Sequence, residues 1–319
     1  MTDVLAVNAV DLTKTYGRLT AVDRISVQVA QGEVYGVLGP NGAGKTTFLR
    51  MLFGLIKPDS GTLELFGRSW AEHGTRTLDG VAGFIESPKF YPGLTGKKNL
   101  QLLAALDGDV PAERLDEVLD TVDLTGREND KVGGYSFGMR QRLGVAASLL
   151  RDPRLLILDE PANGLDPAGI RDMRALVSRL AGSGLTVLLS SHDMAEVEQI
   201  CDDVTIMRTG SVVYHGSIEQ LRERAPAQGT RLVSSDNAAA ADLARGHGLD
   251  VRTEGEDPAG LHLRGTQDQV DLFVRSLVAA GITPRQLSVD ETPLEALFFM
   301  LTEPATSDYA VEATAGAHA

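Results

Sequence analysis

A glycine-rich segment beginning at Gly39 constrains this chain more than any other stretch of its sequence. The segment GPNGAGKTT follows EVYGVL (33–38), which reads as a buried strand, and it precedes a run with helical apolar spacing. Glycine tolerates positive φ and lets the backbone approach a ligand closely, so successive N–H groups can converge on one anion. This strand–loop–helix setting predicts a phosphate-binding loop with a helix N-terminus behind it.

The predicted phosphate loop supplies most of the expected nucleotide contacts. Lys45 is expected to place its charge at the β- and γ-phosphates, and Thr46 to offer its hydroxyl to Mg²⁺. The alternative is a glycine-rich turn with an incidental lysine, which the strand–loop–helix setting disfavours. The predicted nucleotide-binding residues of this segment are Gly39, Pro40, Asn41, Gly42, Ala43, Gly44, Lys45, Thr46 and Thr47.

Two acids at the end of a second apolar run match the chemistry of the loop. The run RLLILDE (154–160) reads as a central parallel strand that ends in Asp159 and Glu160. Asp159 is expected to hold Mg²⁺ through water, and Glu160, on the opposite face of the strand, to act as a general base or to orient water. The alternative is a pair of strand-end acids in a turn.

The order of elements predicts two domains. Strands alternate with helices up to about residue 225, which indicates an α/β domain, residues 1–225, with a helical subdomain at about 90–152. Helical spacing is evident in residues 98–124 and 137–151. Residues 230–304 follow a β-α-β-β-α-β order with a closing helix, which predicts a small ferredoxin-like α+β domain. The tail, residues 305–319, is expected to be disordered.

Composition narrows the possible partners. The net charge of the 319 residues is −14, which argues against a general nucleic-acid binder. The single cysteine, Cys201, excludes an internal disulfide and fits a reducing compartment. No apolar stretch approaches the roughly 18–20 residues that span a bilayer, and the N-terminus lacks the features of a signal peptide. We therefore expect a cytoplasmic protein that reaches a membrane only through a partner.

A third motif indicates a family. YSFGMRQR (135–142) resembles the signature segment of ATP-binding cassette (ABC) proteins, and six separate segments over about 220 residues occur in that family's order. The resemblance implies that Ser136 and the Gly138 N–H bind the γ-phosphate of an ATP held by the opposite subunit. Ser136 could alternatively serve only as a helix N-cap. Phe137 stands where glycine is commoner, and Met139 where glutamine often stands; relatives that resemble peptide-antibiotic exporters tolerate both.

The resemblance assigns further roles by position. Tyr16 is similar to the aromatic residue that stacks on adenine, although a buried core tyrosine is the alternative. Asn163, Gly164, Leu165 and Asp166 look like the loop that crosses the dimer interface beside Glu160. His192 looks like the histidine that contacts the γ-phosphate, although a lone histidine at a strand end is more often structural.

Glu86, in the loop FIESPKFYP (84–92), falls where the family usually has glutamine. The resemblance therefore implies a position between the γ-phosphate and the membrane subunit. A carboxylate there adds negative charge near the triphosphate and the acids Asp159 and Glu160, so we expect Glu86 to reach Mg²⁺ only after MgATP has bound. The alternative is a solvated loop acid, which is the commoner fate of such a residue.

The resemblance implies the ATPase subunit of an ABC exporter of drugs, bacitracin or lantibiotics. ATP and Mg²⁺ are the implied cofactors. A second copy of the chain and a separate polytopic membrane subunit are the implied partners, with no role for nucleic acid. The protein would lie in the cytoplasm, peripheral to the membrane. Two alternatives are a soluble non-transport ABC ATPase acting on a macromolecular assembly and a regulatory module that binds ATP without turnover.

Overall fold

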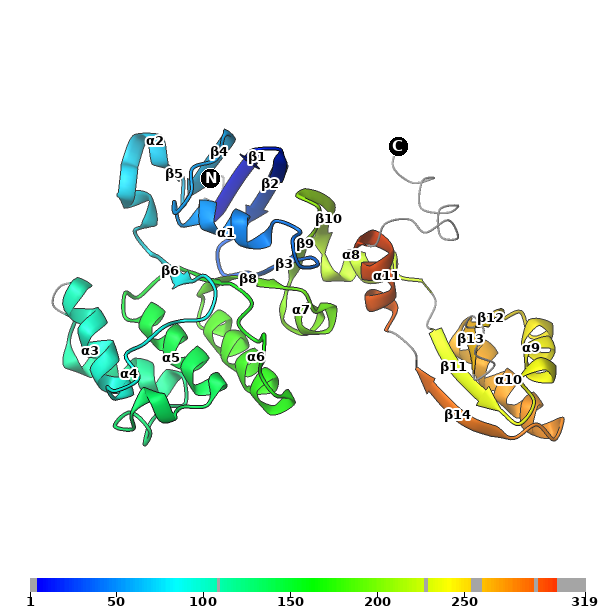
Figure 1. Ribbon diagram of the computed structural model, residues 1–319. Coiled ribbons are helices and arrows are strands. Elements are labelled where there is room, and N and C mark those ends of the chain that lie inside the picture. The colour runs from blue at the N-terminus through cyan, green and yellow to red at the C-terminus, as the bar shows by residue number, and fades with distance from the viewer. Residues whose placement is uncertain (1–4, 108–109, 227–228, 254–259, 290–291, 303–319) are drawn as a thin grey trace. The chain divides into compact units, whose positions relative to one another are not determined.

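A computed structural model describes residues 5–107, 110–226, 229–253, 260–289 and 292–302 (Figure 1). Contacts within the chain divide it into two units, Met1–Ile218 and Glu219–Ala319. This division falls a few residues before 225, where the sequence predicted the first domain to end. The predicted disordered tail lies outside the described residues.

The first unit contains two sheets and most of the helices. Its strands are β1 (Val7–Tyr16), β2 (Leu19–Val29), β3 (Val34–Leu38), β4 (Ser60–Leu65), β5 (Arg68–Ser69), β6 (Val81–Phe84), β7 (Leu155–Leu158), β8 (Thr186–Ser191), β9 (Asp203–Arg208) and β10 (Ser211–Ser217). Its α-helices are α1 (Lys45–Leu52), α2 (Trp70–His73), α3 (Gly96–Asp107), α4 (Ala112–Thr121), α5 (Phe137–Leu149), α6 (Pro167–Gly182) and α7 (Met194–Ile200); short 3₁₀ turns are η1 (Gly74–Leu78) and η2 (Val132–Gly134).

The six-stranded sheet, ordered β10-β9-β3-β8-β7-β6, positions the candidate site. The strands from β9 to β6 pair in parallel, and β10 is antiparallel to β9. Parallel strands end at the same edge of a sheet, so the segments after β3, β7 and β8 meet there. These segments carry the predicted phosphate loop, the acids at the end of RLLILDE and His192.

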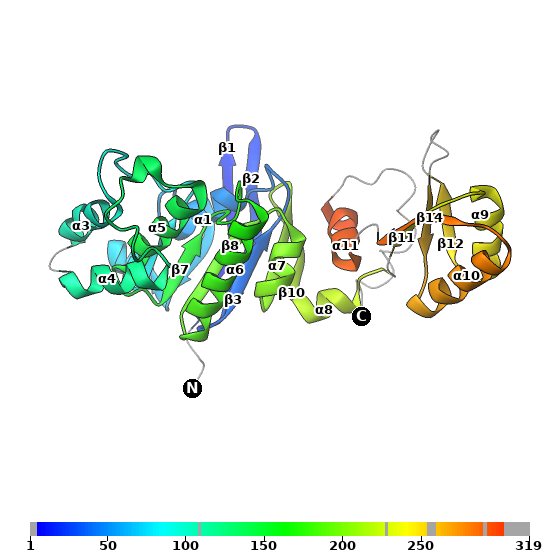
Figure 2. The same cartoon turned by 90° about the horizontal axis from the view of Figure 1, so that it is seen from below.

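The main core of this unit lies between the six-stranded sheet and the second sheet, ordered β2-β1-β4-β5. Helix α1 fills the space between them with Phe48, Leu49 and Leu52, which are fully buried (Figures 1 and 2). Helices α5, α6 and α7 cover the opposite face of the six-stranded sheet. The buried face of α1 fixes the helix, and with it the loop from which the helix starts.

The predicted helices over residues 98–124 and 137–151 are confirmed as α3, α4 and α5. The last of these begins at Ser136, whose side chain accepts a hydrogen bond from the Met139 N–H. The predicted helix after the phosphate loop is shorter than its apolar pattern, because α1 ends at Leu52 and Gly54 then adopts a φ of 63°. Glycine reaches that conformation without the steric cost of a side chain.

The second unit contains one antiparallel sheet ordered β12-β13-β11-β14. Helices α9 and α10 supply most of a small apolar core together with these strands. The chain order of its strands and helices is β-α-β-β-α-β, as expected from the sequence, and its membership of the ferredoxin-like group stays a prediction. Its elements are β11 (Gly229–Ser234), α9 (Asn237–Gly246), β12 (Asp250–Thr253), β13 (Leu261–Arg264), α10 (Gln267–Ala279), β14 (Pro284–Val289) and α11 (Pro293–Thr302), preceded by α8 (Ile218–Glu223).

Across the described part of the chain, no helix combines the length and the apolar character that crossing a membrane requires.

Candidate nucleotide-binding site

The loop between β3 and α1 has the geometry that its glycines predict. Gly42 and Gly44 have φ values of 82° and 104°, and Gly44 is the N-cap of α1. A Cβ on Gly44 would lie 2.3 Å from the Ala21 carbonyl oxygen, and one on Gly39 would lie 2.4 Å from that of Met207. Any side chain at these two positions would therefore displace the loop from its neighbours.

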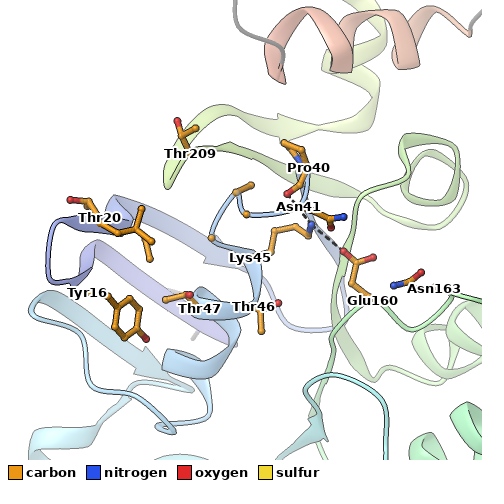
Figure 3. Close-up of a pocket in the computed structure, with 15 residues that line it drawn as sticks. Tyr16, Thr20, Pro40, Asn41, Lys45, Thr46, Thr47, Glu160, Asn163 and Thr209 are labelled. Carbon is orange, nitrogen blue, oxygen red and sulfur yellow. Dashed lines mark hydrogen bonds and ion pairs between the residues drawn. The ribbon is translucent and has the colours of Figure 1, made fainter.

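The loop borders a cavity of about 490 Å³, which is within the size range of small-ligand pockets. Tyr16 lines this cavity with 47% of its surface exposed, so it is not a buried core tyrosine (Figure 3). Asn163, from the predicted dimer loop, also lines the cavity, together with four residues that no sequence motif predicted: Leu19, Thr20, Ala21 and Thr209. The place of these four residues at the cavity follows from the fold.

Glu160 bridges the phosphate loop and the end of β8. Its Oε1 lies 3.0 Å from Nζ of Lys45, and its Oε2 lies 2.7 Å from Nδ1 of His192. Lys45 is buried and also donates to the Gly39 carbonyl oxygen at 2.7 Å. The three predicted residues thus form one polar chain. Its central carboxylate, that of Glu160, thus pairs with the lysine that the sequence predicts to contact the phosphates.

A second polar chain runs through Asp159. Its Oδ2 lies 3.1 Å from the hydroxyl of Thr46, and its Oδ1 accepts a hydrogen bond from Ser190 at 2.6 Å. Ser190 in turn accepts one from the backbone N–H of Glu160 at 2.9 Å. A hydroxyl beside a carboxylate is a hard-oxygen donor set that fits Mg²⁺, which proteins commonly bind through one or two carboxylates together with substrate phosphates.

Ser190 is a candidate site residue that sequence reasoning did not single out. It orients both acids, Asp159 through its carboxylate and Glu160 through its backbone. The available signal was its position at the end of an apolar run, directly before Ser191 and His192. The next residue, Ser191, donates to Glu196 at 2.8 Å, and burial raises the pKa of the Glu196 carboxyl.

The signature segment lies at the start of α5 and does not line the cavity. The Ser136 hydroxyl oxygen accepts a hydrogen bond from the Met139 N–H at 3.2 Å, which makes it an N-cap. A hydroxyl that accepts such a bond retains its own O–H for donation. The N-cap role and the predicted anion contact are therefore compatible at this helix N-terminus.

The predicted dimer loop connects Glu160 to α6. Asp166 caps α6 by accepting a hydrogen bond from the Gly169 N–H at 2.8 Å, and Gly164 has a φ of 79°. Leu165 closes a turn through its N–H to the Ala162 carbonyl oxygen at 3.1 Å. The loop is thus short, turned and anchored at its α6 end.

Glu86 lies apart from the residues that line the cavity. Its Oε1 pairs with Nη2 of Arg50, on α1, at 2.6 Å, and its side chain is 66% exposed. The backbone of Glu86 has a φ of 63°, which is unfavourable for a residue with a side chain. The proposed contact between Glu86 and the metal stays a prediction. The pairing of Glu86 with Arg50 was not predicted by any sequence pattern.

Comparisons with known proteins place this geometry in a family. The profile described as "ABC transporter" matches residues 22–163. The bacitracin transport ATP-binding protein BcrA of Bacillus licheniformis is 39% identical over 300 residues, which cover 92% of this chain and 96% of that protein. This chain belongs to the ABC transporter ATP-binding proteins.

Other relatives and solved structures agree. The lantibiotic transport ATP-binding protein SrtF of Streptococcus pyogenes is 37% identical over 217 residues, which cover 67% of this chain and 93% of that protein. CbiO1 of Clostridium perfringens, described as part of the ABC transporter complex CbiONQ, has a TM-score of 0.63 and 25% identity, covering 68% of this chain and 90% of that chain.

Membership of this family establishes the type of reaction. The chain is an ATP-binding ATPase whose hydrolysis of ATP is coupled to transport. Its first unit is the α/β cassette that the sequence predicted from the phosphate loop and the alternating elements.

Proposed function

We propose that two copies of this chain bind two ATP molecules with Mg²⁺ and power an exporter of peptide antibiotics through a separate polytopic membrane subunit. The chain would lie on the cytoplasmic face of that subunit. The relationship to BcrA extends over 92% of the chain, including most of the second unit, and supports an exported substrate of the bacitracin type. The relationship to SrtF supports the broader class of peptide antibiotics.

One observation supports the proposal that the protein works as a dimer. Lys45, Thr46 and Glu160 line the cavity. Ser136, which the family resemblance assigns to the γ-phosphate, does not line that cavity in its own chain. Ser136 nevertheless heads a 13-residue helix whose N–H dipoles attract anions. A second copy facing the first would complete each site with its Ser136 segment.

The proposal gives each of these residues a step. Incoming phosphates would compete for Lys45 and release its partner, the Glu160 carboxylate, toward the attacking water. Glu160 would then orient that water and accept its proton at Oε1, while His192 holds Oε2 at 2.7 Å. Mg²⁺, held by Thr46 and Asp159, would neutralise charge on the phosphates. Tyr16, which lines the cavity and is partly exposed, would stack on the adenine.

A mixing experiment tests the shared site. A copy carrying Lys45→Ala and a copy carrying Ser136→Arg should each have little ATPase activity, because every site in either homodimer lacks one half. In a mixture, each heterodimer contains one intact site, so activity should return. Heterodimers that form but remain inactive would contradict the shared site. Copurification with a polytopic membrane protein separates this proposal from a soluble non-transport ATPase.

A further inference from the structure

The first turn of α5 packs against the loop 163–166 within the same chain. Cε1 of Phe137 lies 3.5 Å from the point where a Cβ on Gly164 would stand. Cδ2 of Leu165 lies 3.4 Å from the corresponding point on Gly138. Two side chains, one from each segment, thus pack on a glycine of the other. The signature segment and the predicted dimer loop are in direct contact.

The Phe137 ring is held in place from its own helix. The ring is half-buried, and the Arg140 guanidinium carbon lies 5.9 Å from its centroid, within the range of a cation–π interaction. Arg140 is itself anchored by a hydrogen bond from Nη1 to the Tyr135 carbonyl oxygen. Glycine, the commoner residue at position 137 in the resembled family, would leave the surface of Gly164 without this ring.

The loop that receives the ring is joined directly to Glu160. The Asn163 N–H donates to the Glu160 carbonyl oxygen at 3.1 Å, and Gly164 follows at once. A displacement of Gly164 therefore reaches the Glu160 backbone through one turn. That backbone has a φ of 49°, a strained conformation that its neighbours must maintain.

We propose that Phe137 is a positioning residue for Glu160 of its own chain. The inference rests on the proposed function and deepens it. Ser136 would serve the ATP of the partner subunit, while Phe137, the next residue, sets the loop that carries Glu160 toward the chain's own ATP. One rigid contact inside each copy thus links the two nucleotide sites of the dimer.

A heterodimer separates this role from a contribution to the partner's site. Copy one carries Ser136→Arg and keeps Lys45 and Glu160, and copy two carries Lys45→Ala, so the one intact site uses the phosphate loop of copy one. Phe137→Ala is then added to copy one, whose signature segment is already disabled. We expect kcat of the mixture to fall about tenfold, with KM for ATP within about twofold, because misplacing a catalytic group lowers turnover.

Three controls accompany this measurement. Phe137→Leu, which keeps an apolar side chain on Gly164, should restore most of the activity. Phe299→Ala removes an exposed aromatic ring from α11 and should leave the rate unchanged. An unchanged kcat for Phe137→Ala in copy one would overturn the proposal. An inactive parent mixture would instead count against the shared site.

A second measurement does not depend on the dimer. Amide hydrogen exchange of the nucleotide-free single variant Phe137→Ala should be faster at residues 163–166 than in the unmodified chain. Exchange in the phosphate loop, residues 39–46, should be the same in both. Unchanged exchange at 163–166 would overturn the proposal whether or not the two copies share a site.

Discussion

The phosphate-loop region and the start of α5 differ in how they are completed. Around the loop, Glu160 already contacts Lys45 and His192 at 3.0 and 2.7 Å. At the start of α5, Ser136 uses its oxygen to cap the helix and retains an O–H to donate. The polar groups of the first region thus contact one another within the chain. The second region keeps a hydroxyl that can still donate to another group. The shared site that we propose requires such a difference between its two halves.

The largest expected effect comes from the first region. Glu160→Gln keeps the shape of the side chain but removes the base, so turnover should fall by about 10²–10⁴ while MgATP still binds. The variant should accumulate as an ATP-bound dimer in size-exclusion chromatography. Glu117→Gln, an exposed acid on α4, is the matched control and should keep normal turnover. Near-normal hydrolysis by Glu160→Gln would remove Glu160 from the proposed role.

A smaller effect should come from the ion pair that joins α1 to the loop after β6. Exposed ion pairs contribute at most about 1 kcal/mol, so the pair of Arg50 and Glu86 can be exchanged readily for a metal contact. Glu86→Gln should raise the Mg²⁺ concentration that half-saturates ATPase activity and leave the maximal rate within about tenfold. Arg50→Ala should lower that concentration by a few-fold, because it frees the carboxylate.

The double variant and a second ion pair sharpen this test. Arg50→Ala combined with Glu86→Gln should behave like Glu86→Gln alone, since Arg50 acts through the carboxylate. Arg68→Ala breaks the exposed pair with Asp79 and should leave the Mg²⁺ curve unchanged. Superimposable Mg²⁺ curves for Glu86→Gln and the unmodified chain would restore the reading of Glu86 as a solvated loop acid.

The smallest effect concerns stability at the opposite end of β3. Burial, together with the charges of Asp203 and Asp202, raises the pKa of Glu33 to about 7. The folded state therefore binds this proton more tightly than the unfolded state. The resulting stability is complete below about pH 4.5 and is lost as the pH rises to about 7. After allowance for solvent screening, the loss is about 1 kcal/mol.

Glu33→Gln should remove this dependence of stability on pH. Its free energy of unfolding, measured by urea titration at pH 5 and pH 8, should fall less with pH than that of the unmodified chain. Its ATPase activity at pH 8 should be normal, because Glu33 is remote from the phosphate loop along the strand. Equal pH slopes for the two proteins would show that ionisation of Glu33 does not oppose folding.

Much of the fold and half of the site could be predicted from local sequence. The glycines at 39, 42 and 44 encode a loop conformation by themselves, and Lys45 and Thr46 follow at fixed offsets. Apolar runs located the central strands, and Asp159 follows one of them directly. These predictions depend on neighbours in sequence, where spacing alone fixes geometry.

Other features required the tertiary structure. The order β3-β8-β7 brings Ser190 to both acids, and no spacing in the sequence encodes that adjacency. The contact of Phe137 with Gly164 and the pairing of Glu86 with Arg50 join segments that are 27 and 36 residues apart.

The sequence by itself determined the phosphate loop, the alternation of strands and helices, and the types of residue available for the chemistry. Only the tertiary structure decided which of them meet: Glu160 between Lys45 and His192, Ser190 between the acids, and Phe137 on the loop behind Glu160. The physical reason is that backbone conformation responds to adjacent residues, whereas contacts between distant segments depend on how the sheet orders its strands and how the core packs.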